Sequence, residues 1–162
     1  MKLTLIVYYA RLAGVLLLIS GFAKIVSACG TSHILQMTDS VLNISYRFEF
    51  WAVGIIEVAV AGFCFSKGCL LWRIGLVALL ATNFTFYRIG MFWIGGRKYC
   101  PCMGNLTDAI GVSPQIADMV MKIILAFLLL GSYYNLFWLW RQKRKAAPAS
   151  APSGTSAPSP AP

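Results

Sequence analysis

Leu12-Ala13-Gly14-Val15-Leu16-Leu17-Leu18-Ile19-Ser20-Gly21-Phe22-Ala23, residues 12–23, is an apolar run without a single charged side chain. It lies inside a longer apolar segment, from about Leu3 to Val26, that is interrupted only by Arg11 and Lys24. Because an α-helix rises about 1.5 Å per residue, a segment of this length can cross about 30 Å of hydrocarbon. We therefore predict a first membrane-spanning helix here.

Three further apolar segments follow, from about Phe50 to Phe65, Leu70 to Ile94 and Ile116 to Trp140. The first of these is short, so we expect residues 46–49 to extend it through the interface. The chain is 59% hydrophobic and 12% charged, with a mean hydropathy of +0.72, which excludes an ordinary soluble domain. The sequence predicts an all-α, four-helix transmembrane bundle over residues 1–145 that contacts the lipid bilayer.

The remaining residues, 146–162, are only Ala, Pro, Ser, Gly and Thr. Such a composition cannot bury enough apolar surface to offset the entropy lost on ordering. We expect a disordered tail. Since four spans put both termini on one side of the membrane, the side of the tail is also the side of the N-terminus.

Basic residues indicate the orientation in the membrane. The net charge is +9, and its strongest cluster, Arg141 to Lys145, follows the last apolar segment directly. No basic stripe with base-stacking aromatics occurs in a soluble segment, so we expect no nucleic acid partner. The positive-inside rule predicts that both termini lie on the cytoplasmic side of the membrane. Arg47, Arg97 and Lys98 fall in the outer loops and leave the inverted orientation open.

The N-terminal segment has a second interpretation. Val26-Ser27-Ala28-Cys29 is similar to the small-residue box that precedes a lipid-modified cysteine. Lys24 is out of place in the apolar core of a cleavable signal, so we expect a retained helix. Both interpretations leave Cys29 outside.

Two thiols in the second outer loop, Cys100 and Cys102, are the candidate catalytic residues. A disulfide between residues two apart closes a small strained ring, and strain makes the bond a ready oxidant of other thiols. Arg97 and Lys98 supply positive charge that favours the thiolate. The alternatives are two unconnected loop thiols, or a metal site shared with Cys29 and His33; a closed zinc site usually needs two spaced ligand pairs, so we expect no metal.

The other two cysteines, Cys64 and Cys69, fall near the inner turn between the second and third helices. We expect them to be small apolar packing residues at helix ends.

Each predicted helix carries a charge at a similar depth in the outer leaflet: Lys24, Glu57, Arg88 and Lys122. Charges in hydrocarbon are costly unless they face one another. We therefore expect them to converge in the bundle interior, with Glu57 pairing Lys24 or Arg88. The alternative is that the lysines extend to the headgroups and leave a Glu57–Arg88 pair.

These residues together resemble a known family. The order of Gly21-Phe22-Ala23-Lys24, Glu57, Arg88-Ile89-Gly90 and Cys100-Pro101-Cys102-Met103-Gly104 is similar to that of the MauE and DoxX-like family, four-helix proteins of the bacterial inner membrane. The resemblance covers roughly residues 1 to 140. The family signature is similar to C-G-C-F-G, from which Pro101 and Met103 depart.

The resemblance implies methylamine utilisation, or related electron and disulfide chemistry at the outer face. The family's namesake is linked to maturation of the disulfide-rich methylamine dehydrogenase small subunit. By position, Cys100 and Cys102 inherit the signature thiols, and Lys24, Glu57 and Arg88 inherit the buried polar set. Fold analogy does not fix the substrate.

The leading hypothesis is thus a membrane thiol–disulfide redox component that serves an extracytoplasmic partner, either methylamine-dehydrogenase-like or thioredoxin-like. Cys29 could act as a third, resolving thiol. A quinone acceptor is compatible with a cationic pocket in the outer leaflet, but the sequence specifies no cofactor. The alternatives are a non-enzymatic assembly subunit in which the C-x-C loop is a structural staple, and a small transporter.

Overall fold

The computed structural model describes residues 2–30, 35, 38–39, 44–94 and 113–146 of the 162-residue chain. Four helices make up most of this part: α1 (Lys2–Ala28), α2 (Tyr46–Phe65), α3 (Leu70–Trp93) and α5 (Pro114–Ala146). All four are long and apolar enough to cross a membrane. The predicted all-α, four-helix membrane fold is confirmed.

The observed helices differ from the predicted ones mainly in the residues at which they begin and end. The second helix begins at Tyr46, as expected from its short apolar core. The fourth begins at Pro114 because the amide groups of Ile116 and Ala117 both donate to the Ser113 carbonyl, and proline suits a first helical position. It continues to Ala146, where the Arg144 guanidinium lies 3.7 Å from the Trp140 ring centroid and covers that aromatic surface.

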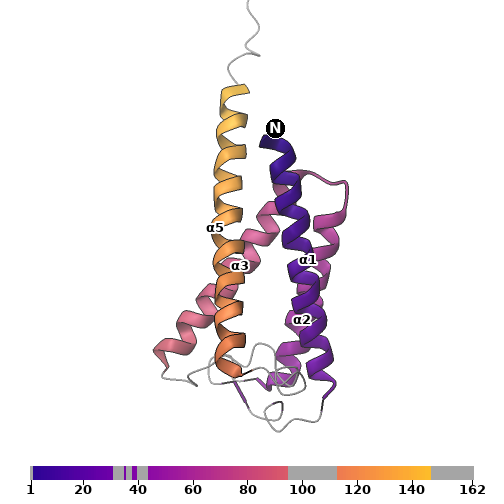
Figure 1. Ribbon diagram of the computed structural model, residues 1–162, viewed down its shortest axis with the longest axis vertical. Helices are drawn as coiled ribbons and strands as arrows, with labels where there is room; N and C mark the ends of the chain where they lie inside the picture. Colours follow the sequence, from indigo (N-terminus) through magenta and orange to yellow (C-terminus); the bar gives the residue numbers. More distant parts are fainter. Residues whose placement is uncertain (1, 31–34, 36–37, 40–43, 95–112, 147–162) are drawn as a thin grey trace, which may run out of the picture.

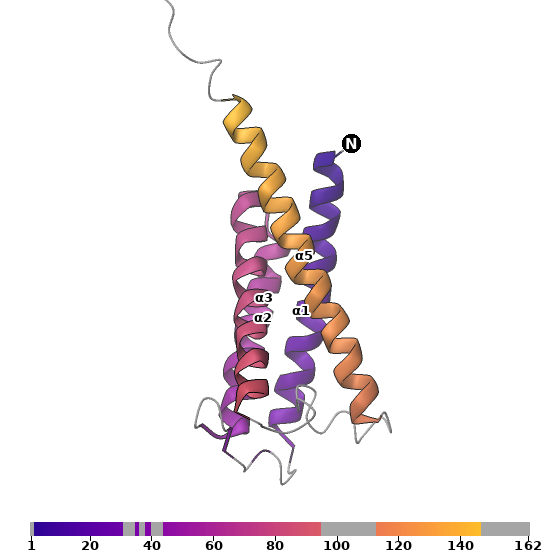
Figure 2. The same cartoon turned by 90° about the vertical axis from the view of Figure 1, so that its left-hand side faces the viewer.

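The helices form two pairs. α1 packs mainly against α2 and α3 mainly against α5, while contacts between the pairs are sparser. Figure 1 shows α3 running obliquely behind α5, away from α1 and α2 at its C-terminal end. The N-terminus and the end of α5 lie at the same end of the bundle, as an even number of spans requires (Figures 1 and 2).

The buried core joins the pairs in the half of the bundle near the termini. Its residues are Ala13, Leu17, Val60, Ala61, Cys64, Val77, Leu80, Ala81 and Leu128. The Tyr9 hydroxyl crosses from α1 and donates to the Leu128 carbonyl at 2.9 Å. Large apolar side chains such as Trp72, Leu79 and Leu130 point outward, which suits helices whose solvent is lipid.

The turn between α2 and α3 is closed by an arginine. Arg73 is buried, and its guanidinium donates to the Cys64 carbonyl near the end of α2. The last carbonyls of a helix have no partner within the helix, so a cation there satisfies one of them and complements the helix dipole.

Two glycines set the close approach of α1 and α2. A Cβ atom on Gly54 would lie 2.8 Å from Ile25 Cγ1 and 3.0 Å from the Gly21 carbonyl oxygen. Small residues let membrane helices approach until their backbones touch. Gly62 on the same helix has open space where its Cβ would lie.

We predict that Gly54→Ala lowers the free energy of unfolding by about 1–3 kcal/mol, because the added methyl meets backbone that cannot move cheaply. Gly62→Ala is the matched control, and its higher helix propensity should leave stability unchanged or improve it by up to about 1 kcal/mol. Unfolding in mixed micelles, followed by circular dichroism, measures both. Equal stability of the two variants would contradict the close helix contact.

Candidate functional site

A buried ion pair joins α1 to α2. Lys24 Nζ lies 2.6 Å from Glu57 Oε1, and the residues are 6% and 1% exposed. Ser20, one turn before Lys24, accepts a hydrogen bond from Nζ at 2.8 Å and donates to Glu57 Oε1 at 3.3 Å. This confirms the expected pairing of Glu57 with Lys24.

The helix pattern explains why the pair forms. Gly21 and Lys24 are three residues apart on α1, as are Gly54 and Glu57 on α2, and residues at this spacing share one helix face. The glycine contact therefore brings the two charged side chains together. Each charge would be costly alone at this depth, so the pair also fixes the register of α1 against α2.

A second ion pair joins α3 to α5. Arg88 Nη1 lies 3.1 Å from Asp118 Oδ1, and Asp118 is buried. Lys122 Nζ lies 2.7 Å from Asp118 Oδ2, but its side chain is 63% exposed. The expectation that Lys122 converges in the bundle interior is therefore wrong, because its side chain turns outward along α5 to the acid one turn earlier.

Sequence reasoning missed Asp118 by considering only the cations of α5. The spacing of Asp118 four residues before Lys122 was the available signal, since such pairs stabilise helices. Because Arg88 pairs with Asp118, it does not compete with Lys24 for Glu57.

The connection between α1 and α2 contributes a buried acid, Asp39. The Tyr87 hydroxyl of α3 donates to Asp39 Oδ2 at 2.6 Å, and the Asp39 amide donates to the Ile44 carbonyl at 2.8 Å. Asp39 also interacts electrostatically with Glu49. Nothing in the local sequence indicates this role, because an aspartate between loop residues is typical of a solvated turn.

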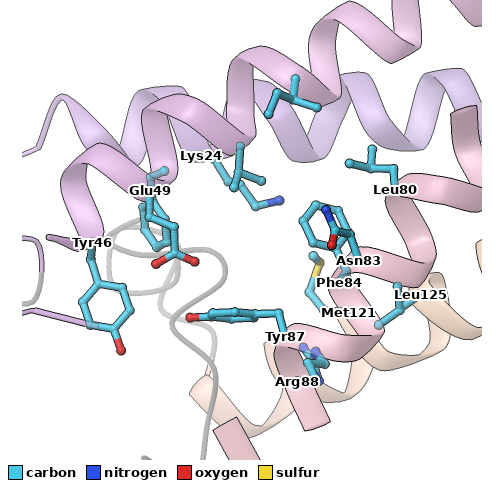
Figure 3. A pocket seen from close by; sticks show the side chains of 13 residues that line it. Lys24, Tyr46, Glu49, Leu80, Asn83, Phe84, Tyr87, Arg88, Met121 and Leu125 are labelled. Carbon is cyan, nitrogen blue, oxygen red and sulfur yellow. The ribbon is translucent and has the colours of Figure 1, made fainter. Parts of the chain in front are cut away.

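A cavity of about 250 Å³ lies between the two helix pairs on the side of these polar groups. Figure 3 shows the Lys24 ammonium pointing toward Asn83 and Phe84, and the Glu49 carboxyl pointing toward Tyr87. Glu49 is 8% exposed, and its Oε2 has no hydrogen-bond partner among the described residues. The remaining lining residues are Tyr46, Phe50, Val53, Ile56, Leu80, Arg88, Met121 and Leu125.

Comparison with known proteins adds one finding. The family model described as "Methylamine utilisation protein MauE" matches residues 1–140. The chain belongs to the MauE family. Searches of curated proteins and of solved structures gave no match.

The MauE match spans all of α1, α2 and α3 and most of α5. It therefore contains both ion pairs and every residue that lines the cavity. The resemblance inferred from the order of motifs is confirmed at the level of the MauE family.

The cysteines of the MauE chain differ in their surroundings. Cys64 is fully buried in the core, which confirms its expected packing role. Cys69 is exposed at the N-cap position of α3, so the same expectation is wrong for it. Cys29 is exposed just after α1. Several further expectations concern residues outside the described part of the chain. These residues are Cys100, Cys102, His33, Arg97, Lys98 and the tail 147–162.

We predict that Lys24→Met and Glu57→Gln each lower the free energy of unfolding by about 3–5 kcal/mol, because either change leaves a buried charged or polar partner without its counterpart. The double variant should lose less than the sum of the two single losses. Lys122→Met is the control: its exposed pair should contribute less than about 1 kcal/mol. Denaturant titration in micelles measures the free energy of unfolding of each variant. A loss in the double variant equal to the sum of the two single losses would refute the pairing.

Proposed function

We propose that this MauE-family chain is a membrane thiol–disulfide redox component in which Cys100 and Cys102 cycle between dithiol and disulfide. In the exchange step a thiolate of one protein attacks the disulfide of the other, and a mixed disulfide forms. The second thiol of the attacking protein then attacks the mixed disulfide and releases the other protein in its dithiol form. Two electrons and two protons pass between the proteins, so the exchange is balanced without another reactant.

The observation that carries the proposal is the arrangement of the described groups around the ends of α3 and α5. The segment bearing both cysteines follows Trp93 and precedes Pro114 in the chain, and these helix ends lie at the end of the bundle opposite the termini (Figures 1 and 2). The exposed thiol of Cys29, after α1, belongs to the same end. An accessible thiol there suits the resolving role.

The partner in this proposal is extracytoplasmic and carries thiols. MauE family membership supports a methylamine-dehydrogenase-like protein, and the exchange chemistry equally suits a thioredoxin-like one. The basic residues of the opposite end, including Lys67, Arg141 and Arg144, favour cytoplasmic termini in a bacterial inner membrane by the positive-inside rule. Disulfide exchange then takes place in the compartment where disulfides persist.

We predict that Cys100→Ser/Cys102→Ser abolishes thiol–disulfide exchange with a glutathione redox buffer at this site while the helices still assemble. Cys69→Ser, which removes an exposed thiol at the other end, is the matched control and should exchange like the wild type. The readout is mass spectrometry of alkylated protein, with circular dichroism for folding. Loss of folding in the double serine variant, together with a wild type that shows no thiol–disulfide exchange with the buffer, would instead support the structural staple.

A second prediction concerns orientation. In single-cysteine variants that retain either Cys29 or Cys69, a membrane-impermeant maleimide applied to intact spheroplasts should label Cys29 and spare Cys69. Both thiols are exposed, and they lie after α1 and before α3, at opposite ends of the bundle. Permeabilised membranes, in which both should react, are the control. Selective labelling of Cys69 would invert the topology and remove the proposed site from the oxidising side.

A further inference from the structure

The cavity between the helix pairs borders the lipid. One of its lining residues, Ile56, is 50% exposed on the outside of α2, and the rest come from membrane-crossing helices. A ligand can therefore reach this cavity from the hydrocarbon, which selects for molecules that dissolve in the bilayer.

The size and walls of the cavity suit one substituted aromatic ring. An engineered protein cavity of about 150 Å³ holds benzene, so about 250 Å³ leaves room for ring substituents but not for a whole lipid. Four of the lining side chains are aromatic, namely Tyr46, Phe50, Phe84 and Tyr87, and aromatic rings pack favourably against other flat rings.

The polar groups of the cavity include both donors and an acceptor. Lys24, Asn83 and Arg88 bring N–H groups to the lining. Glu49 Oε2, buried and without a partner among the described residues, is an acceptor. Buried polar atoms are almost always hydrogen-bonded, so the bound molecule should accept from the first set and donate to Glu49.

We propose that this cavity binds the ring of a membrane quinone. The carbonyl oxygens of a quinone accept hydrogen bonds, and after reduction the same oxygens become hydroxyls that donate. A lipid acyl chain would use neither set of groups. A phosphate headgroup would place its negative charge near Glu49, which is unfavourable.

The quinone also supplies an electron acceptor, a point that rests on the proposed thiol function. When a dithiol becomes a disulfide, two S–H bonds break, one S–S bond forms, and two electrons and two protons leave. A quinone that takes up both electrons and both protons becomes a hydroquinone with two new O–H bonds. The reaction is balanced, and it regenerates the disulfide for the next exchange.

Photolabelling with a decyl-substituted azido-para-benzoquinone tests the site in full-length protein in lipid nanodiscs. Ile56→Trp places a large ring in the cavity wall and should lower labelling about tenfold, which corresponds to about 1.4 kcal/mol. Ile55→Trp is the matched control. Ile55 is next to Ile56 in the chain and is similarly exposed, at 55%, but it does not line the cavity. Ile55→Trp should label like the wild type.

The wild type supplies an independent measurement. Its adducts should map to α2 and α3 segments that line the cavity, and unlabelled decyl-para-benzoquinone should compete while decyl phosphate should not. Labelling spread over the lipid-facing surface without competition, or equal labelling of Ile55→Trp and Ile56→Trp, would overturn the quinone site.

The same probe tests the quinone site independently of the thiol function. Cys100→Ser/Cys102→Ser should keep the competed labelling, since none of the lining residues is changed. Competed labelling in a wild type whose thiols do not exchange with glutathione would support the quinone site and refute the thiol function. Exchange without competed labelling would refute the quinone site alone.

Discussion

The fold depends on the contact between Lys24 and Glu57 in the membrane interior. Neither charge is tolerable alone in hydrocarbon, so α1 and α2 must meet at this depth and in this rotation. The glycines one turn away, Gly21 and Gly54, make that approach possible by letting the backbones touch. A shift of either helix by one residue would separate the charges and would also place side chains where only glycine fits.

In the described part of the chain, the two ion pairs that join different helices lie within the helix pairs and not between them. Lys24–Glu57 holds α1 to α2, and Arg88–Asp118 holds α3 to α5. In the half near the termini, contacts across the seam between the pairs come from the apolar core and from Tyr9. In the other half, Lys24 faces the Phe84 ring and the Tyr87 hydroxyl donates to Asp39. The other half of the seam contains the cavity, because α3 diverges there from α1 and α2.

Hydropathy and length were sufficient to predict the four helices, since a membrane span needs a long apolar segment whatever its neighbours are. The Lys24–Glu57 pair was also predictable, because Glu57 was the single acid recognised in the apolar segments. The errors concern Lys122 and Cys69, whose exposure depends on helix rotation and on the position of a helix end. Asp39 and Asp118 were missed because their burial depends on tertiary contacts with Tyr87 and Arg88.

Stability alone is a weak reason for a buried ion pair, since apolar residues of similar volume often stabilise a protein as well or better. What the pair does here is hold the Lys24 ammonium in the cavity wall, 5.3 Å from the centroid of the Phe84 ring. Glu57 and Ser20 fix the position of Nζ from one side and the aromatic face limits it from the other. A cation held in place beside a lipid-accessible cavity is prepared to meet a carbonyl oxygen, so the contact that sets the register of α1 and α2 also builds the proposed quinone site.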